Sequence, residues 1–568
     1  MTPSTLLLRF DRELDVASLP GFLDGHVVVV ADGEEGALPF ARLRGLRADP
    51  ALRARSFEQV VVHTLEHADL VSVLAAVRYG GRVFHLVDAP GVGVRVGRAR
   101  AVGVVAARRL RRAVARLPLA ARLAGRLGIV LDPGFPGTRT SVAAAETVAS
   151  LAPAPRPPGT TSLRIVHYLC SLGTGGAERQ LVYLARASVE AGHRPVVWTA
   201  YPFGPDSDRQ VAELAAAGVE VRALELHPRT RASARSIRQA LPAPLVEALA
   251  RHAVSPILLP LVEALLAEPP DVLHAWLDEG NAAAGLAGLA TAVPRIVLSG
   301  RGMSPLRMPH LDRPWLRDTY RALARTGRAL LLNNSRAGAD DYAGWLGLPP
   351  GSIEVVPNGL PLERLRPADA AERRALRDSL AIPEGACVVA GLFRLSPEKR
   401  PLAFLEVVGR ASREVPIVTL LAGDGPLADA VRRRAQELGL GSSLRLLGAL
   451  RDPWSTLRAA DLTLLVSSAE GLPNVVLESQ ACGVPVVVTR VGGAPEAIDE
   501  GASGISCPPE DLDGLAGAVV SLARDPARRA AMGRRGRAFV GERFALERTL
   551  ARTLALYSPN TATPKKRG

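Results

Sequence analysis

Residues 461–494 read DLTLLVSSAEGLPNVVLESQACGVPVVVTRVGGA and decide the fold. The apolar run 462–466 predicts a buried strand, and residues 484–489 predict a second one. A polar loop and a helix expected from Asn474 to Gly483 connect them, which completes a β-loop-α-β unit. Such a unit is typical of an α/β fold with a parallel sheet.

Two carboxylates lie in this unit, eight residues apart: Glu470 in the loop and Glu478 on the helix. Open α/β sheets bind ligands at the carboxyl ends of their strands, so Glu470 is expected at a ligand site. The first turn of the helix offers free N–H groups and a positive dipole end, which suit a phosphate. The unit therefore fits a nucleotide sugar, although two isolated glutamates would more simply be surface charges.

Three phrases of this stretch, EGLPNVVLE, ACGVPVVVT and VGGAPE, resemble the donor site of the retaining GT-B glycosyltransferases of family GT4. The resemblance covers about residues 163–557 and is most specific over 388–496. It implies two doubly wound Rossmann-like domains that face a cleft. Residues 163–357 would form the acceptor-side domain, residues 358–545 the nucleotide-sugar-binding domain, and 546–557 a terminal helix that crosses back to the first.

A second match to the family is G-x-x-R-L-x-x-x-K at residues 391–399. The resemblance implies that Arg394 and Lys399 hold the donor pyrophosphate. Two fixed cations suit the charge that accumulates on a departing nucleotide diphosphate. The Gly175-Gly176 turn, which precedes an expected helix over 177–191, resembles the first glycine loop of the family, which faces the donor phosphates.

The resemblance assigns a role to each matching position. Glu470 would hold donor-sugar hydroxyls and act in catalysis together with Arg394 and Lys399, and Glu478 would accept hydrogen bonds from the ribose. The positions implied to bind substrate are Gly175, Gly176, Glu478, Gly471, Leu472, Asn474, Val475 and Leu450.

The acceptor side departs from the family pattern, because Arg301 stands where a histidine near the transferred sugar is usual. This departure leaves open a degenerate enzyme. His274, in a strand expected over 272–276, is either a packed histidine or an acceptor-side residue. The D-x-D at residues 206–208 precedes a helix and is interpreted as capping and solvated charge rather than a metal site. Glu496 would cap its own helix or contact the donor.

Residues 1–158 carry no motif of the family and are expected to form an α/β extension of unknown role. The proline-rich sequence at 152–161, APAPRPPGTT, predicts a linker at its end. Short elements are predicted at residues 27–31, 59–63 and 83–87 (strands) and 70–79 (helix).

Composition describes a globular protein with an uneven positive charge. The net charge of +14 comes mostly from residues 90–130, which hold ten arginines and no acid. Contact with an anionic membrane surface and a plain solvated helix both remain open for this segment. Nucleic acid is not expected as a partner, because no aromatic residues are interleaved with the arginines.

The sequence predicts neither a signal peptide nor a membrane-spanning helix. The four cysteines show no C-x-x-C spacing, which fits a reducing compartment without a zinc site. We therefore expect a cytoplasmic protein, peripheral at the inner face of the cell membrane if the basic segment binds lipid. Residues 558–568 are expected to be disordered.

The implied function is transfer of a sugar from a UDP- or GDP-linked donor to a glycan or lipid-linked acceptor with retention of configuration, in cell-envelope or exopolysaccharide synthesis. No metal or cofactor is expected beyond the nucleotide sugar. The main alternative is a non-catalytic GT-B subunit that binds a nucleotide sugar and assists a partner transferase. A GT-B epimerase or phosphorylase is a further alternative. A Rossmann dehydrogenase is disfavoured because the G-x-G-x-x-G fingerprint is missing.

Overall fold

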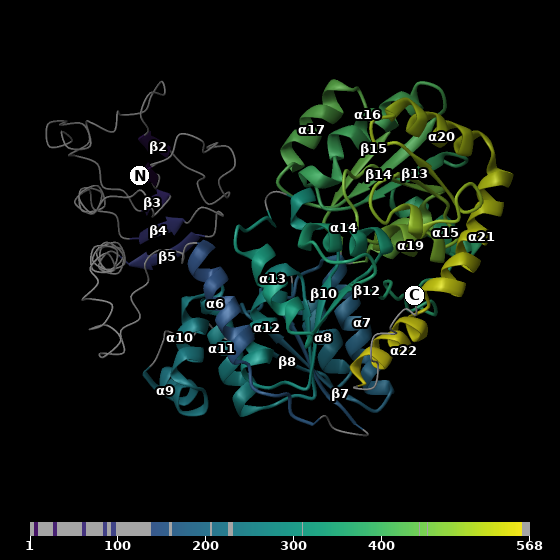
Figure 1. Ribbon diagram of the computed structural model, residues 1–568. Coiled ribbons are helices and arrows are strands. Elements are labelled where there is room, and N and C mark those ends of the chain that lie inside the picture. The colour runs from purple at the N-terminus through teal and green to yellow at the C-terminus, as the bar shows by residue number, and fades with distance from the viewer. Residues whose placement is uncertain are drawn as a thin grey trace, which may run out of the picture. The chain divides into compact units, whose positions relative to one another are not determined.

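The computed structural model describes residues 5–8, 27–30, 59–63, 83–87, 93–97, 138–157, 162–204, 207–224, 231–308, 311–441, 443–450 and 452–558 (Figure 1). The chain divides into two compact units, Met1–Pro136 and Gly137–Gly568. The helix predicted at 70–79, the tail from residue 559 and all of the basic segment except residues 93–97 lie outside the described residues.

The first unit contains one five-stranded sheet in the order β2-β1-β3-β4-β5, parallel except for the β4–β5 pair. Its strands are runs of valine and leucine, the pattern of a parallel sheet. The three predicted strands of this region are confirmed, the first of them ending one residue early. The bounds are β1 (Thr5–Leu8), β2 (Val27–Val30), β3 (Gln59–His63), β4 (Val83–Val87) and β5 (Gly93–Gly97).

The first half of the second unit is a seven-stranded parallel sheet in the order β12-β11-β10-β9-β6-β7-β8. The chain starts at β6, adds two strands on one side and then returns to add four on the other. The strand order thus reverses between β6 and β9, which makes a topological switch point at their carboxyl ends. The strands are β6 (Arg164–Leu169), β7 (Arg194–Thr199), β8 (Glu220–Ala223), β9 (Val272–Trp276), β10 (Arg295–Gly300), β11 (Ala329–Asn333) and β12 (Glu354–Val355).

Helices cover both faces of this sheet. Helix α12 is made almost entirely of alanine, glycine and leucine, and all its residues from Gly280 to Ala290 are buried. A Cβ at Gly288 would lie 2.9 Å from the Ile296 side chain, so glycine permits the close approach of helix to strand. The helices are α6 (Thr138–Leu151), α7 (Gly176–Glu190), α8 (Asp208–Ala216), α9 (Arg231–Ala240), α10 (Ala243–Arg251), α11 (Ser255–Ala267), α12 (Asp278–Ala290), α13 (Leu316–Arg325) and α14 (Arg336–Leu346), with the 3₁₀ turn η5 (Pro305–Arg307).

The predicted boundary of the N-terminal extension at residue 158 is wrong. Ala144, Ala145 and Val148 of α6 are buried in the same core as strands β6 and β9. An apolar helix face must be buried against another element, and α6 finds its partners in α10, α12 and α13. The proline-rich stretch after α6 is therefore a connection within the second unit.

The second half of this unit is a six-stranded parallel sheet in the order β15-β14-β13-β16-β17-β18. It is wound in the same way, with its switch point between β13 and β16. The two doubly wound α/β domains predicted from the sequence are confirmed. The strands are β13 (Cys387–Leu392), β14 (Ile417–Ala422), β15 (Leu444–Gly448), β16 (Leu462–Leu465), β17 (Val486–Thr489) and β18 (Gly504–Cys507).

The last helix returns to the seven-stranded sheet. Helix α22 packs against α7, and its Tyr557 is buried with Ile165 and Val272 beneath it. In the described part of the chain, no helix has both the length and the apolar character needed to cross a bilayer. The helices of this half are α15 (Ala370–Ser379), α16 (Pro401–Ser412), α17 (Ala428–Glu437), α18 (Pro453–Ala459), α19 (Asn474–Ala481), α20 (Leu512–Arg524), α21 (Pro526–Phe544) and α22 (Leu546–Tyr557), with the 3₁₀ turns η7 (Pro397–Lys399) and η8 (Pro495–Ala497).

Candidate functional site

The switch point of the six-stranded sheet brings together two residues that are 71 positions apart in the sequence. Lys399 ends the turn after β13, Glu470 lies in the loop after β16, and Nζ of the lysine is 2.5 Å from Oε1 of the glutamate. Ser467 donates a hydrogen bond of 2.6 Å to the same oxygen. Oε2 of Glu470 has no hydrogen bond to any described residue and is not sealed from solvent, so it is open to a ligand hydroxyl.

Two glycines hold the Glu470 loop in place. The carbonyl of Glu470 accepts a hydrogen bond of 3.1 Å from the Gly493 amide. Gly492 has a positive φ of 47°, and a Cβ there would collide with the same carbonyl. Glycine is therefore required where the V-G-G-A sequence turns against the loop.

The Arg394 loop is rigid in its backbone and free in its side chain. The Leu395 amide donates a hydrogen bond of 2.9 Å to the Asp424 carbonyl, and a Cβ at Gly425 would lie 2.6 Å from the Leu395 carbonyl. The side chain of Arg394 is exposed and has no hydrogen bond or ion pair with a described residue. A cation presented in this way on a fixed loop is available to a phosphate.

Glu478, on the second turn of α19, faces the other half of the unit. Its carboxylate is 3% exposed and lies 3.0 Å from Nη2 of Arg179 on α7. Burial is the largest influence and would lower the pKa of Arg179, but the Glu478 carboxylate together with Tyr183 and Glu178 raises the pKa of the guanidinium above its ordinary value. A ribose that binds Glu478 must therefore share this carboxylate with Arg179 or displace the arginine.

The glycine turn also meets α19 directly. Asn474 donates a hydrogen bond of 3.0 Å to the Gly176 carbonyl, and a Cβ at Gly176 would lie 2.8 Å from the Asn474 amide nitrogen. Asn358 donates 2.6 Å to Asn474 Oδ1 and 2.8 Å to the carbonyl of Leu472. The Gln180 side chain donates a hydrogen bond of 2.9 Å to the Gly359 carbonyl and accepts one of 2.8 Å from the Gly359 amide.

Sequence reasoning did not assign Arg179, Gln180 or Asn358 to the site. Arg179 and Gln180 lie just after the Gly175-Gly176 turn in the sequence GGAERQ, and Asn358 lies just before Gly359 in VPNGL, so the available signal was their closeness to these glycines. The buried amides of Gln180 and Asn358 and the partly buried guanidinium of Arg179 join segments 114 to 299 residues apart along the chain.

The expectation that Glu496 caps its own helix is wrong, whereas its contact with the donor stays a prediction. Its carboxylate accepts hydrogen bonds from the amides of Arg336 at 2.8 Å and Ala337 at 2.7 Å. These are the first two residues of α14, so Glu496 caps a helix of the other half. The free N–H groups and the positive dipole at the N-terminus of α14 attract the Glu496 carboxylate to this position.

His274 lies in the core beneath α22, not on an open surface. Its Nδ1 is 2.7 Å from the Tyr557 hydroxyl, its ring stacks on Trp276 at 4.7 Å, and the residue is 2% exposed. Burial, with help from the neighbouring His167 and Arg301, holds the pKa of His274 well below its ordinary value. The packed alternative fits this environment, whereas Arg301 keeps partial exposure at the end of β10.

The remaining residues that the resemblance implies to bind substrate, Val475, Leu450 and Gly471, have apolar side chains or none. Val475 packs against the core of the second domain from α19, and Leu450 lies partly exposed just after the edge strand β15. Gly471 approaches the other half so closely that a Cβ would lie 2.9 Å from the Arg301 carbonyl. Of the D-x-D residues, Asp208 begins α8, Ser207 precedes it without a side-chain capping bond, and Asp206 lies outside the described residues.

Family models match both halves of the second unit. Residues 174–364 match Glycosyltransferase Family 4, and residues 372–539 match Glycosyl transferases group 1. The Vi polysaccharide biosynthesis protein VipC/TviE of Salmonella typhi is 32% identical over 246 residues, which cover 43% of this chain and 43% of that protein. A D-inositol 3-phosphate glycosyltransferase of Saccharomonospora viridis is 34% identical over 240 residues, 40% of this chain and 54% of that protein. The chain thus matches about half the length of these curated relatives.

Solved structures share the fold. Anabaena Alr3699/HepE in complex with UDP has a TM-score of 0.56 at 21% identity, and the match covers 69% of this chain and 100% of that chain. Sucrose-phosphate synthase from Thermosynechococcus elongatus has a TM-score of 0.55 at 19% identity, with coverage of 70% and 98%. The two-domain GT-B architecture predicted from the sequence is confirmed by these likenesses.

Proposed function

We propose, since this chain belongs to the family 4 and group 1 glycosyltransferases, that it transfers a sugar from a nucleotide-sugar donor to a glycan or lipid-linked acceptor. The observation that carries the proposal is the switch point between β13 and β16. There the Lys399–Glu470 pair, an open carboxylate oxygen and the unpaired Arg394 side chain come from two adjacent loops.

The donor proposed is UDP- or GDP-linked. A structural neighbour is described in complex with UDP-glucose, and a relative from Corynebacterium glutamicum is named a GDP-mannose-dependent mannosyltransferase. In the proposed complex, Glu470 accepts hydrogen bonds from donor-sugar hydroxyls and Glu478 from the ribose. Arg394, Lys399 and the N-terminal turn of α19 bind the diphosphate, because cations and free N–H groups stabilise its charge.

The proposed transfer retains the anomeric configuration and uses the leaving phosphate as the base for the acceptor hydroxyl. The bond from the sugar carbon to the diphosphate oxygen breaks, the acceptor oxygen takes its place on the same face, and the acceptor proton passes to the diphosphate. Fixed cations at the diphosphate lower the barrier because they meet charge that develops in the transition state. No protein base and no metal enter this scheme.

A second candidate is a non-catalytic GT-B subunit that binds a nucleotide sugar for a partner transferase. Arg301 favours it, because the side chain at this position is not the histidine expected of the family. The two candidates share donor binding and differ in turnover.

Release of UDP or GDP from a panel of nucleotide sugars tests the proposal. One donor should support release, and Arg394→Ala should lower kcat/KM by about 10- to 100-fold, the effect expected from losing hydrogen bonds to a charged group. Arg528→Ala, an exposed arginine of α21, serves as the control. Tight donor binding without release, even with membrane lipid extract added, would identify the non-catalytic subunit, and no binding would reject both candidates.

Residues 90–130 give a separate prediction about the acceptor side. If ten arginines without an acid bring the protein to an anionic membrane, it should sediment with phosphatidylglycerol vesicles at low salt and be released at about 0.5 M salt. Neutral phosphatidylcholine vesicles are the control. Equal sedimentation with both kinds of vesicle, or with neither, would leave the segment as plain scaffold.

A further inference from the structure

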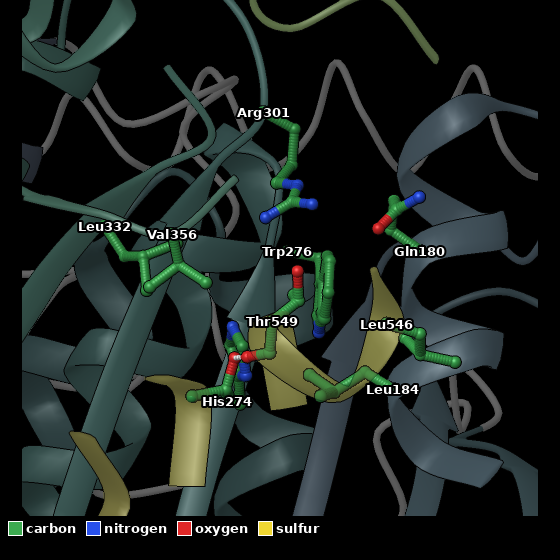
Figure 2. Close-up of a pocket in the computed structure, with 10 residues that line it drawn as sticks. Gln180, Leu184, His274, Trp276, Arg301, Leu332, Val356, Leu546 and Thr549 are labelled. Carbon is green, nitrogen blue, oxygen red and sulfur yellow. Dashed lines mark hydrogen bonds between the residues drawn. The ribbon is translucent and has the colours of Figure 1, made fainter. Parts of the chain in front are cut away.

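Arg301 borders a small pocket in the first half of the unit. Gln180, His274, Trp276 and Arg301 line it together with leucines of α7 and β11, Val356 just after β12, and a leucine and two threonines of α22. Figure 2 shows the guanidinium directed down from the end of β10 toward the Trp276 ring, with Gln180 facing it from α7. The guanidinium carbon lies 4.8 Å from the centroid of that ring.

No carboxylate of the described residues forms an ion pair with this cation. Among the described residues, Arg301 donates only to neutral groups: 2.6 Å to Asn358 Oδ1 and 3.4 Å to Ser299 Oγ. Its Nε is buried and has no hydrogen-bond partner. The nearby Glu470 carboxylate is already engaged by Lys399.

An uncompensated buried charge is costly, and proteins usually supply a partner for it. Burial lowers the pKa of Arg301 to about 9, so the guanidinium is still a cation at neutral pH. Stacking on Trp276 offsets part of the cost, but a full counter-charge is missing. Arg301 is partly exposed as a residue and lines the pocket.

The backbone of Arg301 also lies beside the loop that carries Glu470. A Cβ at Gly471 would lie 2.9 Å from the Arg301 carbonyl and 2.8 Å from Gly302 Cα. Gly471 directly follows Glu470, the carboxylate with one open oxygen. A group bound to that carboxylate therefore lies beside the end of β10.

We propose that Arg301 is a specificity-determining residue that binds an oxyanion, a carboxylate or phosphate, carried by the substrate at the Glu470 site. The inference rests on the proposed function and narrows its substrate class to negatively charged sugars. The anion comes from the donor sugar, as in a uronate, or from the acceptor. Arginine suits both because its planar fork binds such groups with two parallel hydrogen bonds.

Matched pairs of probes separate the two sources. The donor arm compares UDP-glucuronate with UDP-glucose and GDP-mannuronate with GDP-mannose. The acceptor arm compares octyl glucuronide and octyl glucoside 6-phosphate with octyl glucoside. Each pair is measured by nucleotide release and by calorimetric binding with wild type, Arg301→Gln, Arg301→Lys and the control Arg317→Gln, an exposed arginine of α13.

Wild type should prefer the charged member of one arm, and Arg301→Gln should reduce kcat/KM for that member about 10- to 100-fold while the neutral member changes less than twofold. Arg301→Lys should recover part of the preference, because it restores charge without the fork. Arg317→Gln should behave as wild type. The arm in which the preference disappears identifies the source of the anion.

An equal loss of kcat/KM for charged and neutral probes in Arg301→Gln would overturn the inference and leave Arg301 as a structural contact of Asn358. A wild type without any preference for the charged probes would overturn it as well. Failure of the proposed function is a different result, in which no donor releases nucleotide. Calorimetry then still decides on Arg301, because equal affinity for the charged and neutral members of every pair would reject the anion site.

Discussion

Replacing Glu470 by alanine is expected to lower the rate of nucleotide release from the preferred donor by about 100-fold or more. Two losses combine. The donor sugar loses the open carboxylate oxygen, and Lys399 loses the partner 2.5 Å away that fixes its position. Hydrogen bonds to a charged group contribute about 1.5–3 kcal/mol, and each 1.36 kcal/mol changes a rate tenfold.

The measurement is steady-state nucleotide release with the donor that wild type prefers. Glu470→Gln separates charge from shape, because its amide oxygen can still accept from Ser467 and a ligand hydroxyl while the partner of Lys399 loses its charge. Its rate should fall between those of wild type and Glu470→Ala. Glu384→Ala, at an exposed position, is the control. Wild-type turnover by Glu470→Ala would remove this carboxylate from the site.

Most of the fold could be predicted because parallel strands buried on both faces are continuous apolar runs. β9 and α22 have the predicted bounds, and β16 and β17 differ from the predicted strands only at their ends. The motifs fixed the loops after β13 and β16 as the place for a ligand. That placement followed from local sequence, because the loop at the carboxyl end of a strand is defined by the strand itself.

Contacts between the two halves could not be predicted in the same way. Glu496 caps α14 from 160 residues away, and Glu478 meets Arg179 from 299 residues away. Such pairs depend on how whole domains are oriented, and they produce no hydrophobic periodicity in either segment that would reveal them. The boundary at residue 158 failed for a related reason. Proline-rich sequence predicts an extended connection but does not say on which side of it the preceding helix finds its core.

Asp461, the first residue of the fold-deciding stretch, carries the largest expected effect on stability. Its carboxylate accepts three hydrogen bonds, from Arg373 at 2.7 Å, from Arg377 at 2.6 Å and from the Val388 amide at 2.8 Å. Its side chain is 14% exposed. It therefore joins α15 to the adjacent starts of β13 and β16. Asp461→Ala removes the carboxylate that balances two arginines and the acceptor of one amide, and the arginines keep only neutral backbone carbonyls as partners. This loss should lower the free energy of unfolding by about 3 kcal/mol.

A loss of that size should lower the Tm of the domain that contains β13 and β16 by about 5–10 °C in a calorimetric scan. Asp513→Ala is the matched control, because its ion pair with Arg410 is 87% exposed on the aspartate side and should shift the Tm by less than about 1 °C. An unchanged Tm for Asp461→Ala would show that the arginines find other partners. Together with Glu470→Ala, the variant separates two roles within one β-α-β unit. Glu470→Ala should lower turnover by about 100-fold or more and shift the Tm less than Asp461→Ala does, because the one cation it unpairs, Lys399, is 25% exposed. Asp461→Ala, well below its own Tm, should retain most of the turnover, because Asp461 lies at the opposite end of β16 from the ligand loop.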